Sequence, residues 1–222
     1  KLVIQSNEGE DAGVRVEVVG GELTSARAAG CPRGTVMDVR DLFFNVPARR
    51  KFLRTTATEL AHCQEAVVRQ ALGRPDVAFR LIHDGRVLLD TQVGTTATRV
   101  RDVLGRDAER LLDVSFERAS CSGSGHVSPL SVHRPAAKAL YLYVNGRFVR
   151  DPVVRRAVAD AYRDRVPRGR HPLIVLYLTF EGGEVDVNVH PAKTEVRFRS
   201  PRSVQEAITE GLRAALNPQR MA

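Results

Sequence analysis

One lysine in this chain has the setting expected of a residue that meets a phosphate group. Lys193 follows residues 185–190, where apolar and polar residues alternate as in a half-buried strand. Pro191 ends that strand because proline has no N–H to donate to a ladder, and Val196 resumes the alternation. A lysine at such a chain reversal can bind a phosphate as a point charge. An exposed loop lysine with no ligand explains the same spacing.

Two further stretches carry residues that could bind phosphate. Gly34 and Thr35 open a predicted strand at 36–40. Glycine lets the backbone approach a ligand closely, and threonine offers a hydroxyl and an N–H, although a glycine at a strand entry also has a purely structural explanation. The second stretch is the basic run Arg49, Arg50 and Lys51. This run forms either a phosphate-facing patch or the first turn of a helix with solvated arginines, and we favour the helical turn.

The positive charge of the chain is concentrated in one segment. The net charge is +8, and residues 134–170 contain ten Lys or Arg against three acids, which is +7 by subtraction. Asp151 is the predicted N-cap of a helix in this segment, with apolar residues on one side and arginines on the other. Concentrated positive charge is the footprint of a polyanion partner, although a solubilising face has the same composition. The candidate DNA-binding residues are Arg147, Arg150, Arg155, Arg156 and Arg163.

Composition sets further limits. The chain has 222 residues, 43% of them apolar, which is enough for the core of one large domain or two small ones. No apolar run reaches the roughly 18 residues of a membrane span, and no membrane partner is expected. The three cysteines are widely spaced without a CxxC pair, which favours free thiols in a reducing cytoplasm. His126 and His133 lack a third ligand at a recognisable spacing, so no metal site is expected.

Local patterns predict the elements that would hold these residues. Thr56 and Glu59 predict the capped start of a helix that ends near Gly73. Two dipeptides predict tight hairpin turns, Asp84-Gly85 and Asn145-Gly146.

Two stretches are predicted to lack regular structure. The small polar run 92–98 predicts a domain boundary near residue 95, and residues 120–124 are predicted to form a flexible loop. The part after this boundary runs strand, strand, helix, strand, strand, helix. That order is typical of a mixed sheet covered by helices.

Three motifs resemble those of one known family. The stretch 185–198, VDVNVHPAKTEVRF, is similar to the signature that closes the ATPase region of the MutL family of DNA mismatch repair proteins. Gly34-Thr35, together with the run 41–53, DLFFNVPARRKFL, resembles a second motif of that family. The run 143–147, YVNGR, resembles a third. The motifs occur in the family's order, and the resemblance covers essentially the whole chain.

The resemblance implies an α+β fold in two domains. Residues 1–95 would be the C-terminal part of a GHKL (Bergerat-type) ATPase domain, which is an α/β sandwich. Residues 96–222 would be a ribosomal-protein-like β-α-β domain with helices packed on a mixed sheet. The family's catalytic Glu, its Mg-binding Asn and its D-x-G-x-G and G-F-R-G-E-A-L motifs do not occur in these residues. We therefore expect a part of the ATP-hydrolysing region, with no measurable ATPase activity and no tight nucleotide binding by itself.

The resemblance also implies ligands and partners. ATP and Mg²⁺ would bind in the intact protein, with Gly34 and Thr35 at the phosphates and Lys193 acting in catalysis by neutralising the γ-phosphate. DNA would bind without sequence specificity. Further partners would be the mismatch-recognition protein MutS, downstream repair enzymes and a second copy in a homodimer. The location would be cytoplasmic, with association with the nucleoid during repair. A stand-alone nucleic-acid-binding module with no nucleotide role is the alternative.

Overall fold

The chain folds into two compact units. The computed structural model describes residues 1–9, 11–118, 121–135, 139–186 and 194–217. The N-terminal unit is Lys1–Ala61 and the C-terminal unit is His62–Ala222. The boundary between these two units falls within a helix in the sequence, not in the polar run at 92–98. The family's domain boundary near residue 95 stays a prediction.

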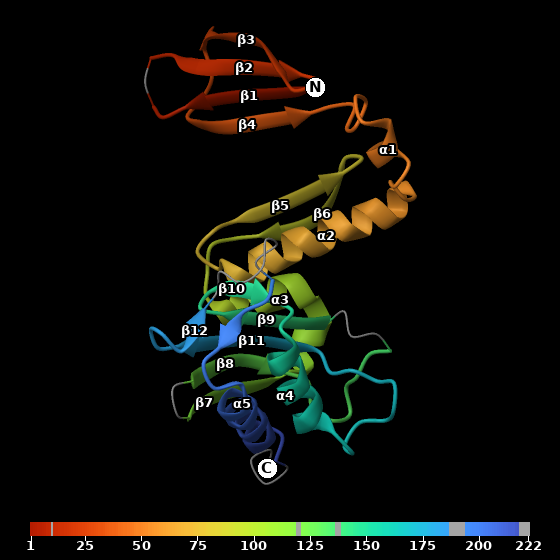
Figure 1. Cartoon of the computed structure of the whole chain (residues 1–222), viewed down its shortest axis with the longest axis vertical. Coiled ribbons are helices and arrows are strands. Elements are labelled where there is room, and N and C mark those ends of the chain that lie inside the picture. The colour runs from red at the N-terminus through yellow and green to blue at the C-terminus, as the bar shows by residue number, and fades with distance from the viewer. Residues whose placement is uncertain (10, 119–120, 136–138, 187–193, 218–222) are drawn as a thin grey trace. The chain divides into compact units, whose positions relative to one another are not determined.

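The N-terminal unit is built on a four-stranded antiparallel sheet (Figure 1). Its strand order is β3-β2-β1-β4, so consecutive strands pair except where β4 joins the free edge of β1. The strands are β1 (Leu2–Asn7), β2 (Gly13–Val19), β3 (Glu22–Ala29) and β4 (Gly34–Val39). A single helical turn, α1 (Pro47–Arg50), follows the sheet, and α2 (Thr56–Gly73) begins at the end of the unit.

The C-terminal unit is built on a five-stranded mixed sheet of order β10-β9-β11-β8-β7. β9 and β11 are parallel, with β10 and α4 between them in sequence, and the other neighbours are antiparallel. The sheet strands are β7 (Leu112–Arg118), β8 (Cys121–Val127), β9 (Leu140–Val144), β10 (Arg147–Val149) and β11 (Ile174–Phe180). The remaining elements after β10 are α4 (Pro152–Tyr162), the short pair β12 (Val185–Asp186) and β13 (Arg197–Phe198), and α5 (Pro201–Ala215).

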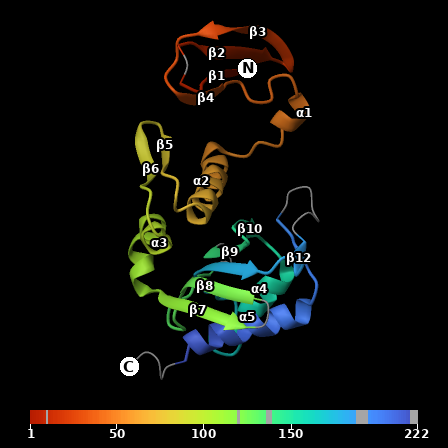
Figure 2. The same cartoon turned by 90° about the vertical axis from the view of Figure 1, so that its left-hand side faces the viewer.

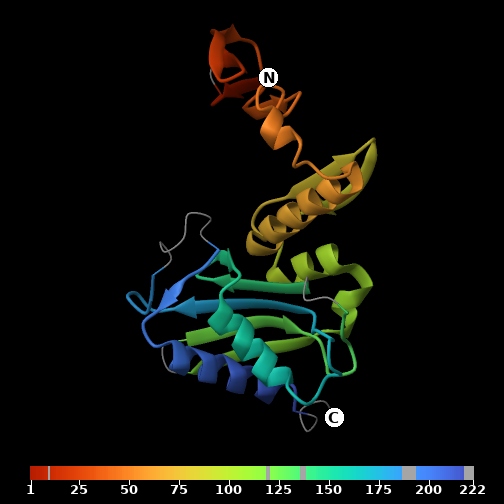
Figure 3. The same ribbon diagram turned by 45° about the vertical axis from the view of Figure 1, so that its right-hand side comes forward.

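Both faces of this five-stranded sheet are covered by helices. Alternate residues of β11 point to opposite sides, and Ile174 and Leu176 pack with residues of α4 and α5 into the larger core. These two helices lie on one side of the sheet (Figure 3). Leu173 and Val175 pack on the other side with Leu72 of α2 and Val100 of α3. The α+β fold with helices packed on a mixed sheet is therefore confirmed.

A helix and a hairpin complete the C-terminal unit. α3 (Thr96–Leu104) runs into the 3₁₀ turn η1 (Gly105–Arg110), and the hairpin β5 (Phe79–His83) and β6 (Arg86–Thr91) follows α2 (Figure 2). Both predicted hairpin turns occur, with left-handed φ angles of 46° and 74° at Asp84 and Gly85 and of 47° and 76° at Asn145 and Gly146. These angles are those that a two-residue turn requires.

Two local predictions were wrong. α2 begins at Thr56, and Thr55, not Thr56, supplies the capping hydroxyl to the N–H of Thr58 (3.4 Å), while Glu59 accepts from the N–H of Arg54 (2.9 Å). Residues 121–124, predicted as loop, belong to β8, which lies between β11 and β7 in the sheet. Their glycines serve packing there, because a Cβ on Gly123 would collide with the ring of Phe116.

Candidate functional sites

The basic helix predicted from sequence is α4. Asp151 is its N-cap, and its carboxylate accepts hydrogen bonds from the N–H groups of Val153 (2.8 Å) and Val154 (3.2 Å). Pro152 occupies the first turn, where no N–H is needed. On the apolar side of the helix, Val154, Ala157, Val158 and Ala161 are buried in the larger core. The opposite side is therefore held in a fixed orientation by the core.

That opposite side presents arginine side chains to solvent. Arg155 and Arg156 are exposed on it, and Arg150 is exposed just before the helix. Arg163 follows the last turn and is also exposed, but it is bonded to the carboxylate of Asp160. Arg147 begins β10 and is half-buried. The structure thus brings Arg150, Arg155 and Arg156 to one end and one side of α4, and it offsets the charge of Arg163.

The cap of α4 also anchors the chain that follows Lys193. Lys193 lies outside the described residues, but Thr194 accepts a hydrogen bond on its carbonyl from the N–H of Arg150 at 2.7 Å. The carboxylate of Asp151 accepts another from the N–H of Val196. One buried carboxylate therefore ties the start of α4 to the segment immediately after the predicted phosphate-binding lysine.

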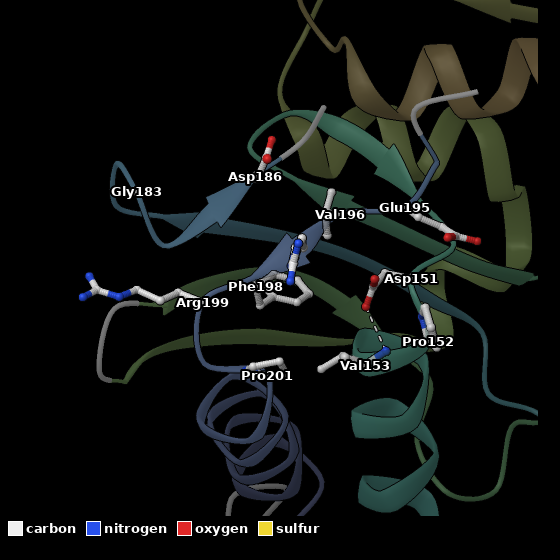
Figure 4. A pocket seen from close by; sticks show the side chains of 11 residues that line it. Asp151, Pro152, Val153, Gly183, Asp186, Glu195, Val196, Phe198, Arg199 and Pro201 are labelled. Atoms are coloured by element: carbon white, nitrogen blue, oxygen red, sulfur yellow. Dashed lines mark hydrogen bonds between the residues drawn. The ribbon is translucent and has the colours of Figure 1, made fainter. Parts of the chain in front are cut away.

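Asp151 lies at the edge of a pocket of about 690 Å³. Its side chain points to the first turn of α4, while the side chain of Arg199 extends away from that helix (Figure 4). Asp151 is 3% exposed, and this burial raises the pKa of its carboxyl above the usual range even though the three N–H donors oppose the shift. The residues that line the pocket include both negatively charged carboxylates and positively charged arginines, so the pocket has no clear preference for an anion.

The remaining predicted residues lie in the N-terminal unit. Gly34 begins β4 with a left-handed φ of 123°, and the hydroxyl of Thr35 is 2.8 Å from the hydroxyl of Ser6 on β1. Both residues are exposed. The basic run after Pro47 begins a short exposed helix, as favoured from sequence: Arg49 and Arg50 end α1, and Lys51 follows it. Contact of Gly34, Thr35 or Lys193 with a nucleotide stays a prediction.

Arg99 is a buried structural residue that the sequence analysis missed. It is 1% exposed, and its guanidinium donates to the carbonyls of Ala71, Arg74, Pro75, Val77 and Gln92. These carbonyls belong to the end of α2 and to both ends of the β5–β6 hairpin. Arg99 therefore joins three segments to α3 and neutralises the negative end of the α2 dipole. The only signal in the sequence is that Arg99 lies four residues before the apolar Val103, which places both on the same side of α3.

Comparisons with known proteins agree with this architecture. A family model described as DNA mismatch repair protein, C-terminal domain, matches residues 100–217. The DNA mismatch repair protein MutL of Anaeromyxobacter dehalogenans is 45% identical over 216 residues, which are 96% of this chain and 36% of that protein. This chain therefore spans about a third of the length of the curated relatives that it matches.

Solved structures show the same fold. The N-terminal domain of a DNA repair protein matches with a TM-score of 0.83 at 22% identity, covering 100% of this chain and 73% of that one. The ATPase domain of Aquifex aeolicus MutL, solved in complex with ADP, matches with a TM-score of 0.68 at 25% identity, covering 94% of this chain and 72% of that one. The fold is thus that of the ATPase domains of DNA repair proteins. Together with the family match, these findings show that the chain belongs to the MutL family of DNA mismatch repair proteins.

No helix among the described residues combines the length and the apolar character needed to cross a membrane.

Proposed function

We propose that the C-terminal unit binds duplex DNA through its phosphate backbone, without reading its sequence. The observation that carries this proposal is the rigid presentation of Arg155 and Arg156 on the exposed side of α4, with Arg150 beside them. Arginines that meet phosphates position a protein on DNA and release counterions, and they carry no base information by themselves. Arg147 and Arg163 complete the proposed contact set, with Arg163 contributing less because Asp160 already pairs with it.

Charge reversal on α4 tests this proposal. Arg155→Glu with Arg156→Glu should weaken binding of a fluorescent duplex at least tenfold at fixed salt, because two phosphate contacts become repulsions. The matched control is Arg80→Glu with Arg86→Glu on the β5–β6 hairpin, which makes the same change in net charge at exposed sites. Equal losses for both pairs would indicate a general charge effect and contradict a site on α4. Duplexes of unrelated sequence should bind with the same affinity.

The nucleotide part of the function rests on the family. The Aquifex aeolicus MutL ATPase domain was solved with ADP. In the intact protein, Gly34 and Thr35 would contact the phosphates of ATP bound with Mg²⁺, and Lys193 would neutralise the γ-phosphate. The intact protein would work as a homodimer with MutS and downstream repair enzymes, at the nucleoid in the cytoplasm.

Lys193→Ala in the intact protein tests the assignment of the lysine. ADP lacks the γ-phosphate, so ADP affinity should stay nearly unchanged. The rate of hydrolysis should fall roughly ten- to a hundredfold, which corresponds to the loss of one charge-assisted contact in the transition state. Lys193→Arg should restore only part of the rate because the guanidinium is longer and planar. Equal losses of ADP and non-hydrolysable analogue binding would show that Lys193 serves the whole pocket instead.

A further inference from the structure

A second basic surface lies on the C-terminal unit, apart from the exposed side of α4. It is a groove of about 560 Å³ between the C-terminal half of α2 and the β9–β10 turn, with Thr194 at its margin. Three arginines line it, Arg69 and Arg74 from α2 and its end and Arg147 from β10, and none of the described lining residues is acidic. We propose that this groove binds a phosphate of the nucleic-acid backbone, which extends the DNA-binding surface proposed above and rests on that proposal.

The arginines on the α2 side are held in place by carboxylates outside the groove. The Nε and Nη2 atoms of Arg74 donate to the two oxygens of Asp76 at 2.9 Å and 2.7 Å. Arg69 donates its Nε to Glu65 at 2.9 Å, and its guanidinium lies 4.6 Å from the ring centre of Phe148. Each carboxylate occupies one edge of its guanidinium and leaves Nη1 without a partner in the described part of the chain. Such prior ordering lowers the entropy cost of binding a ligand.

The C-terminus of a helix normally repels anions because its last carbonyls carry partial negative charge. At the end of α2, several of these carbonyls accept hydrogen bonds from side chains. The hydroxyl of Tyr143 donates to the carbonyl of Arg69 (2.7 Å), and the hydroxyl of Tyr177 donates to that of Leu72 (2.8 Å). Arg99 donates to the carbonyls of Ala71 and Arg74. Donors from the sheet and from α3 thus engage four carbonyls in and just after the last turn of α2. They reduce the negative charge that this helix end would present to a phosphate.

The groove suits a phosphate and not a base. Tyr143 is buried and stacks on Tyr177 with 5.0 Å between ring centres, and Arg69 covers Phe148. The two described rings that line the groove, Tyr143 and Phe148, are thus already engaged by other groups, so the contact would be independent of sequence. A nucleoside triphosphate offers the same phosphate chemistry as DNA, and the experiment must separate these two sources.

Two substitutions of opposite expected effect test the groove in the full 222-residue chain. Arg74→Gln should flatten the dependence of log K on log salt for duplex binding by about 0.9, the value for one lost phosphate contact. Asp76→Asn keeps an oxygen acceptor that holds Arg74 in place but removes the negative charge beside it, so it should raise duplex affinity. Arg80→Gln is the matched control, because Arg80 also pairs with a carboxylate and its side chain is 60% exposed against 59% for Arg74. It should leave the salt dependence unchanged.

The outcomes separate this inference from the proposed function. If Arg74→Gln leaves the duplex slope unchanged while Arg155→Glu with Arg156→Glu lowers affinity, the groove is not a DNA site and the α4 proposal stands. If neither change affects binding, the proposed function itself fails. ATP binding is measured in parallel, and we expect no tight binding by the wild-type chain. ATP binding that Arg74→Gln abolishes without any change in duplex binding would assign the phosphate to a nucleotide and overturn the inference.

Discussion

The two sheets of this chain obey the same alternation but differ in what covers them. In the N-terminal unit, the registers place Leu2, Ile4, Val16 and Val18 on one face together with Met37 and Val39. The other face carries the ion pairs Lys1–Glu17, Arg15–Glu17 and Arg40–Asp38. Yet Met37 is 67% exposed and Val39 is 59% exposed. In the C-terminal unit, every residue of β9 from Tyr141 to Val144 is buried.

The difference shows that alternation of apolar and polar residues is enough to form a sheet. Helices packed on the sheet are needed to hold its side chains in a rigid framework. Helices cover both faces of the five-stranded sheet. Its loops and helix ends therefore hold charged side chains in defined positions, which is what binding of phosphate requires. On the apolar face of the N-terminal sheet, by contrast, Met37 and Val39 stay largely exposed.

The largest expected effect concerns Arg99, which is a charged side chain buried in the C-terminal unit. The described part of the N-terminal unit contains no buried charged or polar side chain. Arg99→Met should lower the free energy of unfolding of the C-terminal unit by about 3 to 5 kcal/mol, since several carbonyls lose their donor. All four tyrosines lie in this unit and the chain has no tryptophan, so tyrosine fluorescence during urea unfolding reports on it. A loss below about 1 kcal/mol would show that the five bonds add little.

A matched pair of truncations tests the contrast between the sheets directly. Leu176→Ala, at a fully buried position in β11, should cost about 2 to 5 kcal/mol through the cavity that it leaves. Met37→Ala, on the exposed face of β4, should change stability by no more than about 0.5 kcal/mol. Denaturation followed by far-UV circular dichroism gives both values. Similar costs at the two positions would mean that the N-terminal sheet face is covered in solution.

The pH dependence of Asp151 is a smaller effect. Its pKa in the folded chain lies above the ordinary 3.8, so the folded chain keeps the proton to higher pH than the unfolded chain does. Stability therefore falls as pH rises from about 3.8 through the folded pKa, and it is constant above that window. Relative to Asp151→Asn, which keeps an oxygen acceptor for the cap, the wild type should lose stability between pH 4 and pH 7. A relative gain over that range would show that the hydrogen bonds outweigh burial.

Cysteine reactivity gives the mildest test, because it requires no substitution. Cys63 is exposed, whereas Cys121 is 2% exposed on β8 and burial raises its pKa to about 11. The thiolate is the reactive form, so a disulfide reagent at pH 8 should label Cys63 quickly and Cys121 only after unfolding. Mass spectrometry of the labelled peptides identifies each site. Rapid labelling of Cys121 in the native chain would indicate that the larger core opens readily.

Much of the fold was predictable because its signals are local. The two hairpin turns and the capped, amphipathic α4 follow from residues adjacent in sequence. β8 was not predictable in this way. Its serines and glycines read as a loop, and the need for small residues arises from Phe116 and Val175 on neighbouring strands. A Cβ on Gly125 would collide with the carbonyl of Val175, and only the tertiary structure shows this.

The candidate sites also divide into those with a local sequence signal and those that depend on the tertiary structure. The exposed arginines of α4 were predictable from helical periodicity, and their contact with DNA stays a prediction. The groove between α2 and β10 was not, because Arg69, Arg74 and Arg147 are far apart in sequence and only the fold places them together. The anchoring of Thr194 and Val196 to the start of α4 likewise depends on contacts across more than 40 residues.

The central claim, that a rigid basic surface of this chain binds DNA by its phosphates, is tested most directly by the salt dependence of duplex binding. Fluorescence anisotropy with the wild-type chain at several salt concentrations gives the slope of log K against log salt. With about five phosphates neutralised, the slope should be near −4 to −5 and the same for duplexes of unrelated sequence. Binding whose affinity does not change with salt, or no binding at low salt, would contradict the claim.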